Sequence, residues 1–185
     1  MSAHGMTHAV QAQTPRVYLA GPDVFRRDAA THYAHLQALC AARGLMGLRP
    51  CEGEEDDAQA CGTRLAQQLY EGNLALIRSC DAVLANLSPF RGPVEPDSGT
   101  VFEVGVAVAL GKPVAAWMPQ AGRAYAERVM QAFPTRTDAR GVFWCEADDT
   151  WVEGFGEPLN LMLSRSTRLF ASIEEALDHL AGQLG

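Results

Sequence analysis

The chain of 185 residues has no cluster of basic side chains. Its 15 lysines and arginines are scattered among 22 acidic residues, and the formal net charge is −7. Nucleic acids and anionic membrane surfaces attract such clusters through their phosphate groups, so neither is an expected partner. No apolar run approaches the ~20 residues that span a bilayer. The longest run, after Glu103, is interrupted by Gly105 and ends at Gly111.

The five cysteines are an odd number and include no C-x-x-C pair. This argues against a zinc site and against a disulfide framework in a chain of this size. Reduced thiols in a cytoplasmic protein are the expected state. Residues 1–15 have neither a basic start nor an apolar centre, so we expect a disordered leader and not a signal peptide. A single domain over 16–185 is expected to follow.

Several signatures of catalysis and cofactor binding are also missing. The sequence has no G-x-G-x-x-G or G-x-x-x-x-G-K-[ST] loop, no H-E-x-x-H motif and no G-x-S-x-G elbow. His32 and His35 are expected on the solvated face of a helix. These absences exclude the common dinucleotide, metal and serine-hydrolase chemistries, and no metal or organic cofactor is predicted.

Apolar runs and helical periodicity alternate along the chain. Runs typical of buried strands occupy 16–20, 45–48, 81–86 and 114–118, with a further short strand at 142–145. Helical spacing covers 28–43, 62–79, 99–110 and 172–184, with a shorter helix at 158–164. Residues 52–57 read as an acidic loop. The alternation predicts an α/β fold with a mostly parallel, five-stranded sheet and helices on both faces.

Ligands of such sheets bind beyond the carboxyl ends of the strands, at the point where the strand order reverses. This rule is expected to bring three loops together: 21–25, 86–98 and the loop after Met118.

Two carboxylates lie where the second of these loops enters a helix. Asp97 falls at or just before the helix start, and Glu103 lies about one turn inside. A helix N-terminus carries roughly half a positive charge, which favours an ionised carboxylate. Such a group, correctly oriented, is what a glycosyl-transfer nucleophile must be. Capping explains the same spacing: Thr100-x-x-Glu103 is a capping box, and Asp97 or Ser98 suits an N-cap.

Four other residues also have plain structural interpretations. Tyr18 fits a buried strand, and Asn73 fits a solvated position on a helix. Phe25 fits loop packing, and Asn160 fits an N-cap or a turn.

Taken together, these segments resemble the nucleoside 2-deoxyribosyltransferase family over nearly the whole chain after residue 15. The order and spacing of the matching segments make the resemblance specific. They are Val17-Tyr-Leu-Ala-Gly-Pro22 with Phe25, Tyr70-x-x-Asn73, the run 81–92, the run 97–105 and the run 158–162. The resemblance implies a flavodoxin-like fold and transfer of 2-deoxyribosyl groups between nucleobases by retaining double displacement.

The resemblance also implies roles for individual residues. Glu103 matches the nucleophile, Asp97 matches the acid that hydrogen-bonds the base, and Tyr18 matches the residue that orients the nucleophile. Substrate contacts are expected from Gly21, Phe25, Asn73, Asn86, Gly99, Asn160 and Met162. The last two match a segment that reaches into a neighbouring subunit's site in the family, which implies a homo-oligomer. Deoxynucleosides and free nucleobases are the implied partners.

Asn73 departs from the pattern of some family members, which carry an aspartate there. An amide can form hydrogen bonds but cannot supply an acid proton. Either Asp97 acts alone as the acid, or Asn73 holds the base while a water takes part.

Two other functions fit the same scaffold. A hydrolase of deoxynucleoside monophosphates would let water resolve the sugar ester and would need phosphate contacts, for which Arg26, Arg27 and Arg91 are candidates. A non-catalytic nucleotide-binding module would use Glu103 only as a helix cap.

Overall fold

A five-stranded parallel sheet forms the centre of the computed structural model, which describes residues 13–51 and 62–185. Most of the predicted leader and the predicted acidic loop 52–57 lie outside the described residues. The strand order is β2-β1-β3-β4-β8, and each neighbouring pair is parallel. The strands are β1 Arg16–Ala20, β2 Met46–Leu48, β3 Ala82–Asn86, β4 Val114–Trp117 and β8 Arg168–Phe170.

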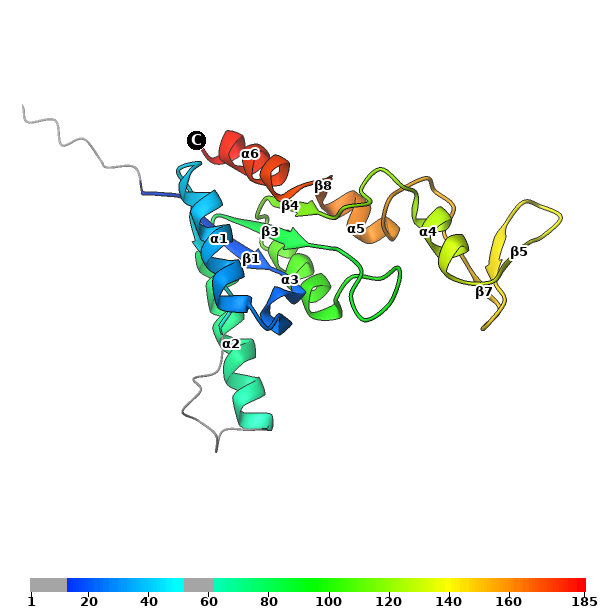
Figure 1. Ribbon diagram of the computed structural model, residues 1–185, viewed down its shortest axis with the longest axis horizontal. Helices are drawn as coiled ribbons and strands as arrows, with labels where there is room; N and C mark the ends of the chain where they lie inside the picture. Colours follow the sequence, from blue (N-terminus) through cyan, green and yellow to red (C-terminus); the bar gives the residue numbers. More distant parts are fainter. Residues whose placement is uncertain (1–12, 52–61) are drawn as a thin grey trace, which may run out of the picture.

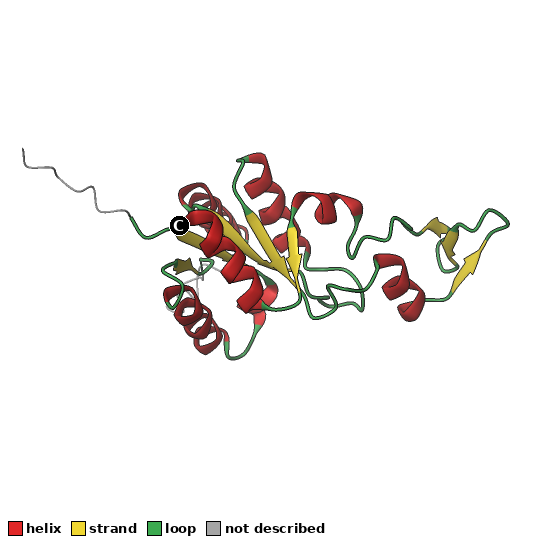
Figure 2. Cartoon of the chain, turned by 90° about the horizontal axis from the view of Figure 1, so that it is seen from above, coloured by secondary structure: helices red, strands yellow, loops and turns green. Residues whose placement is uncertain are grey.

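Helices cover both faces of this sheet (Figures 1 and 2). The helices α1 Ala29–Ala41 and α6 Ile173–Leu184 pack on one face, in a core that includes Val17 and Leu19 of β1. The other face carries α2 Thr63–Ser79, α3 Ser98–Ala109 and α5 Leu161–Ser166. Tyr18 and Ala20 point to that second face. Successive strand residues face opposite sides of a sheet, so the apolar run of β1 serves two cores.

The fifth strand is not the one that the sequence suggests. The strand expected at 142–145 is present as β6 Phe143–Cys145, but it belongs to a separate antiparallel sheet. The parallel sheet is instead completed by β8, which pairs with β4 at the sheet edge. β8 has three residues, too few to show a periodic pattern, and so only its pairing identifies it.

Residues 119–158 form an arm that extends away from the parallel sheet (Figures 1 and 2). It contains α4 Tyr125–Ala132 and the antiparallel strands β5 Thr135–Thr137, β6 and β7 Thr150–Trp151. Arg128 of α4 is buried and donates hydrogen bonds to the carbonyl oxygens of Val94 and Pro158, at 2.9 and 2.6 Å. The arm is thereby tied to the loop that leads into α3 and to the segment that leads into α5.

The predicted helices are confirmed as α1, α2, α3, α5 and α6, with ends that differ by at most three residues. A short 3-10 helix, η1 Pro22–Phe25, follows β1. The periodic pattern did not reveal α4, β5 or β7, which belong to the irregular arm. No described helix is both long and apolar enough to cross a membrane.

Candidate active site

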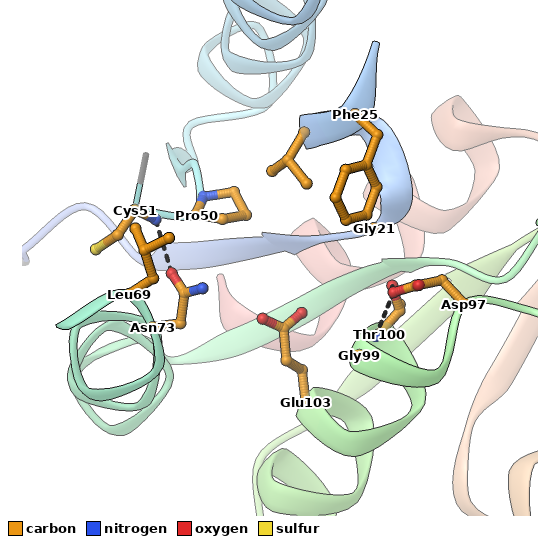
Figure 3. A pocket seen from close by; sticks show the side chains of 11 residues that line it. Gly21, Phe25, Pro50, Cys51, Leu69, Asn73, Asp97, Gly99, Thr100 and Glu103 are labelled. Carbon is orange, nitrogen blue, oxygen red and sulfur yellow. Dashed lines mark hydrogen bonds between the residues drawn. The ribbon is translucent and has the colours of Figure 1, made fainter. Parts of the chain in front are cut away.

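A cavity of about 370 Å³ opens beyond the carboxyl ends of β1, β2 and β3. The chain moves from β1 to β2 on one side and later to β3 on the other, so the cavity lies where the strand order reverses. Its walls come from the segments after β1 and β2 and from α2 and α3 (Figure 3). The lining residues are Gly21, Val24, Phe25, Pro50, Cys51, Leu69, Asn73, Asp97, Gly99, Thr100 and Glu103.

The carboxylate of Glu103 projects from the second turn of α3 toward the middle of the cavity (Figure 3). Tyr18, which is fully buried in β1, donates a hydrogen bond of 2.6 Å from its hydroxyl to Glu103 Oε1. Glu103 Oε2 accepts no hydrogen bond from the residues that the structure describes. One oxygen is therefore fixed by the core, and the other is presented to a ligand.

Burial has the largest effect on the pKa of Glu103 and raises it to about 7. The hydrogen bond from Tyr18 lowers this pKa, and the negative charge of Asp97 raises it. Burial also raises the pKa of Tyr18, and the adjacent Glu103 charge raises it further. Tyr18 consequently keeps its proton and remains a donor, whereas Glu103 changes its charge close to neutral pH.

Asp97 is the N-cap of α3 and also lines the cavity. Its Oδ2 accepts hydrogen bonds from the backbone N–H and the hydroxyl of Thr100, at 2.8 and 2.9 Å. The expected alternative, in which Thr100 caps the helix and Glu103 reaches back to it, is wrong because Thr100 lies inside α3. Capping occupies only one oxygen of Asp97, which leaves Oδ1 for a substrate.

Asn73 faces the cavity from α2 and does not lie on a solvated surface (Figure 3). Its Oδ1 accepts a hydrogen bond of 2.7 Å from the backbone N–H of Cys51. A backbone N–H can be satisfied only by the oxygen of the amide, so this contact fixes the orientation of the side chain. Asn73 therefore presents its Nδ2–H donors to the cavity, and its partner on a substrate must be an acceptor.

Phe25, which lines the cavity, is packed against an aromatic ring and a guanidinium group from the loop after β3. Phe25 stacks on Phe90 with ring centroids 5.4 Å apart and an interplanar angle of 18°. The guanidinium of Arg91 lies 5.0 Å from the Phe25 centroid and 4.7 Å from that of Phe90. Phe25 remains 59% exposed and lines the cavity, so part of its ring is accessible to a planar ligand.

The expected site residues do not all meet at this cavity. Gly21, Phe25, Asn73, Asp97, Gly99 and Glu103 line it. Asn86 is buried behind the wall, where its amide bonds Asp23 and the Ser88 N–H. The loop after Met118 leads into the arm and contributes no lining residue; Pro50 and Cys51, which follow β2, take its place.

Asn160 and Met162 lie at a second cavity, of about 680 Å³, between α3 and α5. Asn160 caps α5 by accepting from the Met162 N–H, and its Nδ2 donates to Glu153 Oε1 at 2.7 Å. The Met162 side chain is 70% exposed. Neither residue reaches Glu103 within one chain, so their expected role in a neighbour's site stays a prediction.

Three further expectations concern charged groups. His32 is not on a solvated face, because its Nε2 lies 3.1 Å from Asp23 Oδ1, whereas His35 is exposed.

Arg26 forms two hydrogen bonds of 2.9 Å to Asp28, and the guanidinium of Arg91 lies over the rings of Phe25 and Phe90. Two of the three arginines proposed for phosphate binding are thus engaged within the chain.

Pro50, Cys51, Val24 and Asp23 are residues at or near the site that sequence reasoning did not name individually. Cys51 follows β2, and the rule that ligands bind at the carboxyl ends of strands could have indicated it. Asp23 carries no signal of its own in the sequence, because a loop aspartate is an ordinary residue.

The sequence matches a family model described as nucleoside 2-deoxyribosyltransferase over residues 17–162. The chain belongs to the nucleoside 2-deoxyribosyltransferase family. The matched span contains Tyr18, Asn73, Asp97 and Glu103 and ends at Met162.

Known proteins similar to this family member include one from Leishmania mexicana. Its structure, described as a 2-desoxiribosyltransferase, is 35% identical, has a TM-score of 0.70 and aligns over 91% of this chain and 97% of its own. A conserved protein from Enterococcus faecalis V583 is 22% identical over 92% of this chain and 99% of its own, with a TM-score of 0.57, which shows the shared fold. The flavodoxin-like fold of the deoxyribosyltransferases is thereby confirmed.

An uncharacterised protein from the yeast Schizosaccharomyces pombe (strain 972) is 36% identical over 118 residues. The alignment covers 63% of this chain and 56% of the yeast protein, so this deoxyribosyltransferase family member spans little more than half of that relative.

Proposed function

We propose that this protein transfers 2-deoxyribosyl groups between nucleobases by retaining double displacement, with Glu103 as the covalent nucleophile. The observation that carries the proposal is the carboxylate of Glu103, which lines the cavity and is held through Oε1 by Tyr18 at 2.6 Å, while Oε2 accepts no hydrogen bond from the described residues. The cavity volume of about 370 Å³ lies within the range of small-molecule sites.

In the first half-reaction, Glu103 Oε2 bonds to C1′ of a deoxynucleoside while the bond from C1′ to the base nitrogen breaks. The electron pair of that bond leaves with the base, which takes a proton from Asp97. General acid catalysis of this kind contributes ~10²–10⁴ in rate. The transition state resembles an oxocarbenium ion, and a missing 2′-hydroxyl eases the positive charge at C1′.

In the second half-reaction, a nitrogen of another base attacks C1′, and the ester bond to Glu103 breaks. The carboxylate is regenerated, and the proton of the incoming base returns to Asp97. Two inversions at C1′ give retention overall. Asn73 donates a hydrogen bond to an acceptor of the substrate in both halves, because Cys51 holds its oxygen. The exchange of free bases and nucleosides suits a role in nucleoside salvage in the cytoplasm.

The proposal is tested by incubating the protein with deoxyinosine and adenine. Formation of deoxyadenosine supports transfer. Release of free sugar at a rate that added base does not change supports the hydrolase instead. Repeating the comparison with deoxyinosine monophosphate tests whether phosphate improves the substrate. Binding of nucleosides without any turnover in the wild-type protein would favour the non-catalytic module.

The nucleophile is identified by reaction with a 2-fluoro-2-deoxy-arabinosyl nucleoside, which slows hydrolysis of the sugar ester. Mass spectrometry of the digested protein is expected to find the sugar on the peptide that contains Glu103. A sugar on any other residue would overturn the assignment.

We also propose that a second copy of the chain covers the groove between α3 and α5 and places Met162 near the partner's cavity. Val108 and Met162 are exposed apolar side chains that line this groove, at 38% and 70%. Exposed apolar surface of this kind marks an interface, and closed symmetry is usual in soluble oligomers.

Mixed oligomers test this arrangement. Glu103→Gln and Met162→Asp subunits are each expected to have little activity alone. Co-expressed, they form hybrid sites with one intact Glu103 and one intact Met162, and part of the activity returns. A fully active monomer in sedimentation would contradict the arrangement.

A further inference from the structure

A buried carboxylate that the proposed reaction does not use lies directly behind the cavity wall. Asp23, in η1, is only 8% exposed. Its Oδ2 accepts a hydrogen bond of 3.0 Å from Asn86 Nδ2, and its Oδ1 lies 3.1 Å from His32 Nε2. A buried polar group is costly unless it has partners, and the hydrogen bond from Asn86 supplies one for Oδ2, whereas His32 Nε2 approaches Oδ1 without the geometry of a hydrogen bond.

The hydrogen-bonded pair Asp23 and Asn86, called the anchor below, joins the two loops that flank the switch point. Asn86 ends β3, and its Oδ1 accepts from the Ser88 N–H at 3.1 Å, while its Nδ2 reaches Asp23 in the loop after β1. The oxygen of the buried Asn86 amide binds one loop and its nitrogen binds the other. Asn86 therefore links the two loops by hydrogen bonds.

The anchor sits immediately behind residues that line the cavity. Val24 and Phe25, which follow Asp23 in η1, and Gly21, which precedes the helix, are all lining residues. A Cβ atom at Gly21 would lie 2.7 Å from Asp23 Oδ2 and 2.9 Å from Asn86 Cβ, so the backbone packs closely on the anchor.

The same two loops meet again through Phe25, which lines the cavity. Phe25, two residues after Asp23, stacks on Phe90, two residues after Ser88. The loops are thus joined at their base by Asn86 and at their tips by the ring stack.

We propose that Asp23 is a positioning residue, which acts through Asn86 to hold Phe25 as the platform on which the nucleobase stacks. This inference rests on the proposed function, since a base must occupy the cavity. Stacking on an aromatic ring tolerates every base, because every base has a π-face. The anchor would accordingly govern the binding of all bases to a similar degree and leave the chemistry at Glu103 largely unchanged.

Asn86→Asp tests the anchor, because it places a second carboxylate within hydrogen-bond distance of Asp23 and drives the two loops apart. We expect the KM for the acceptor base to rise about tenfold or more, as loss of base stacking predicts. The kcat is expected to change by less than about threefold, since Tyr18 and Glu103 are untouched.

The reciprocal variant, which combines Asp23→Asn with Asn86→Asp, is the matched control. It restores one donor and one acceptor between the two positions, and the carboxylate introduced at position 86 can still accept from the Ser88 N–H. Rescue of the KM in this double variant supports the anchor. A KM that stays as high as in Asn86→Asp, or a folded Asn86→Asp protein with the wild-type KM, would overturn it.

Asn86→Ala is measured if Asn86→Asp does not fold, with thermal melting to establish folding. It removes the donor to Asp23, and the same rise in KM is expected. A wild-type KM in folded Asn86→Ala would refute the inference. If the wild-type protein does not exchange bases, the proposed function fails, and calorimetric binding of free adenine to the same variants still decides whether the anchor supports base binding.

Discussion

Replacing Glu103 by glutamine is expected to stabilise the folded protein at neutral pH while it abolishes turnover. Stabilisation is expected because burial raises the pKa of Glu103 from 4.5 to about 7. Between these two values the carboxyl group is ionised in the unfolded chain but protonated in the folded one. Wild-type stability relative to the neutral amide therefore falls as the pH rises through this window.

The size of the effect follows from the pKa difference. At about 1.4 kcal/mol per pKa unit, the shift corresponds to about 3 kcal/mol above pH 7, and to nothing below pH 4.5. Glutamine keeps the acceptor oxygen for the hydroxyl of Tyr18, so the hydrogen bond at 2.6 Å does not have to be lost. The variant is expected to lose activity on the order of 10⁴-fold or more, as a missing nucleophile implies.

Urea unfolding of both proteins at pH 4.5, 6 and 8 measures the prediction. The free-energy difference in favour of Glu103→Gln should grow from pH 4.5 to pH 8. Glu146→Gln, at an exposed carboxylate of the arm, is the control and should show no such trend. A Glu103→Gln protein that is equally stable or less stable than wild type at pH 8 would refute the electrostatic reasoning, and normal turnover would refute the nucleophile.

Three further predictions concern the same site. The kcat/KM of base exchange should rise with pH and level off above about pH 7, because Glu103 must be ionised to attack; a flat profile from pH 5 to 8 would contradict this. Tyr18→Phe removes the hydrogen-bond donor that favours ionised Glu103, so the pH profile of kcat/KM should shift to higher pH. At pH 7 kcat/KM should fall ~10-fold or more. An unshifted pH profile would contradict this role of Tyr18. Gly21→Ala should lower the free energy of unfolding by ~1–3 kcal/mol in urea, because the added methyl group would collide with Asp23 and Asn86. An unchanged free energy of unfolding would show that these side chains can move aside.

Local patterns explain why much of the site could be predicted. The apolar run of β1, the helical spacing of α3 and the carboxylates at its start are all local features of the chain. Such features depend on backbone propensity and on the spacing of apolar residues. Both are determined by residues that are close together in the sequence. The position of the crevice followed from the alternation of strands and helices, because parallel sheets place their ligands at one edge.

Contacts between distant segments could not be predicted in this way. The hydrogen bond between Tyr18 and Glu103 joins residues 85 apart in sequence, and the bond between Asn86 and Asp23 joins residues 63 apart. Asn86 was expected to contact the substrate, yet its amide is used inside the wall. Nothing local to Asn86 distinguishes these two roles, since an asparagine at the carboxyl end of a strand suits both.

The sequence by itself determined the alternating elements, the crevice at their carboxyl ends and the presence of Glu103 at the start of α3. The tertiary structure alone decided that Tyr18 binds one oxygen of Glu103, which way the amide of Asn73 points and how far burial moves the pKa of the carboxylate. The period of side chains along one element fixes which face each residue occupies. Orientation and charge depend on the dielectric surroundings and on donors that other elements bring, and these exist only after the elements have packed.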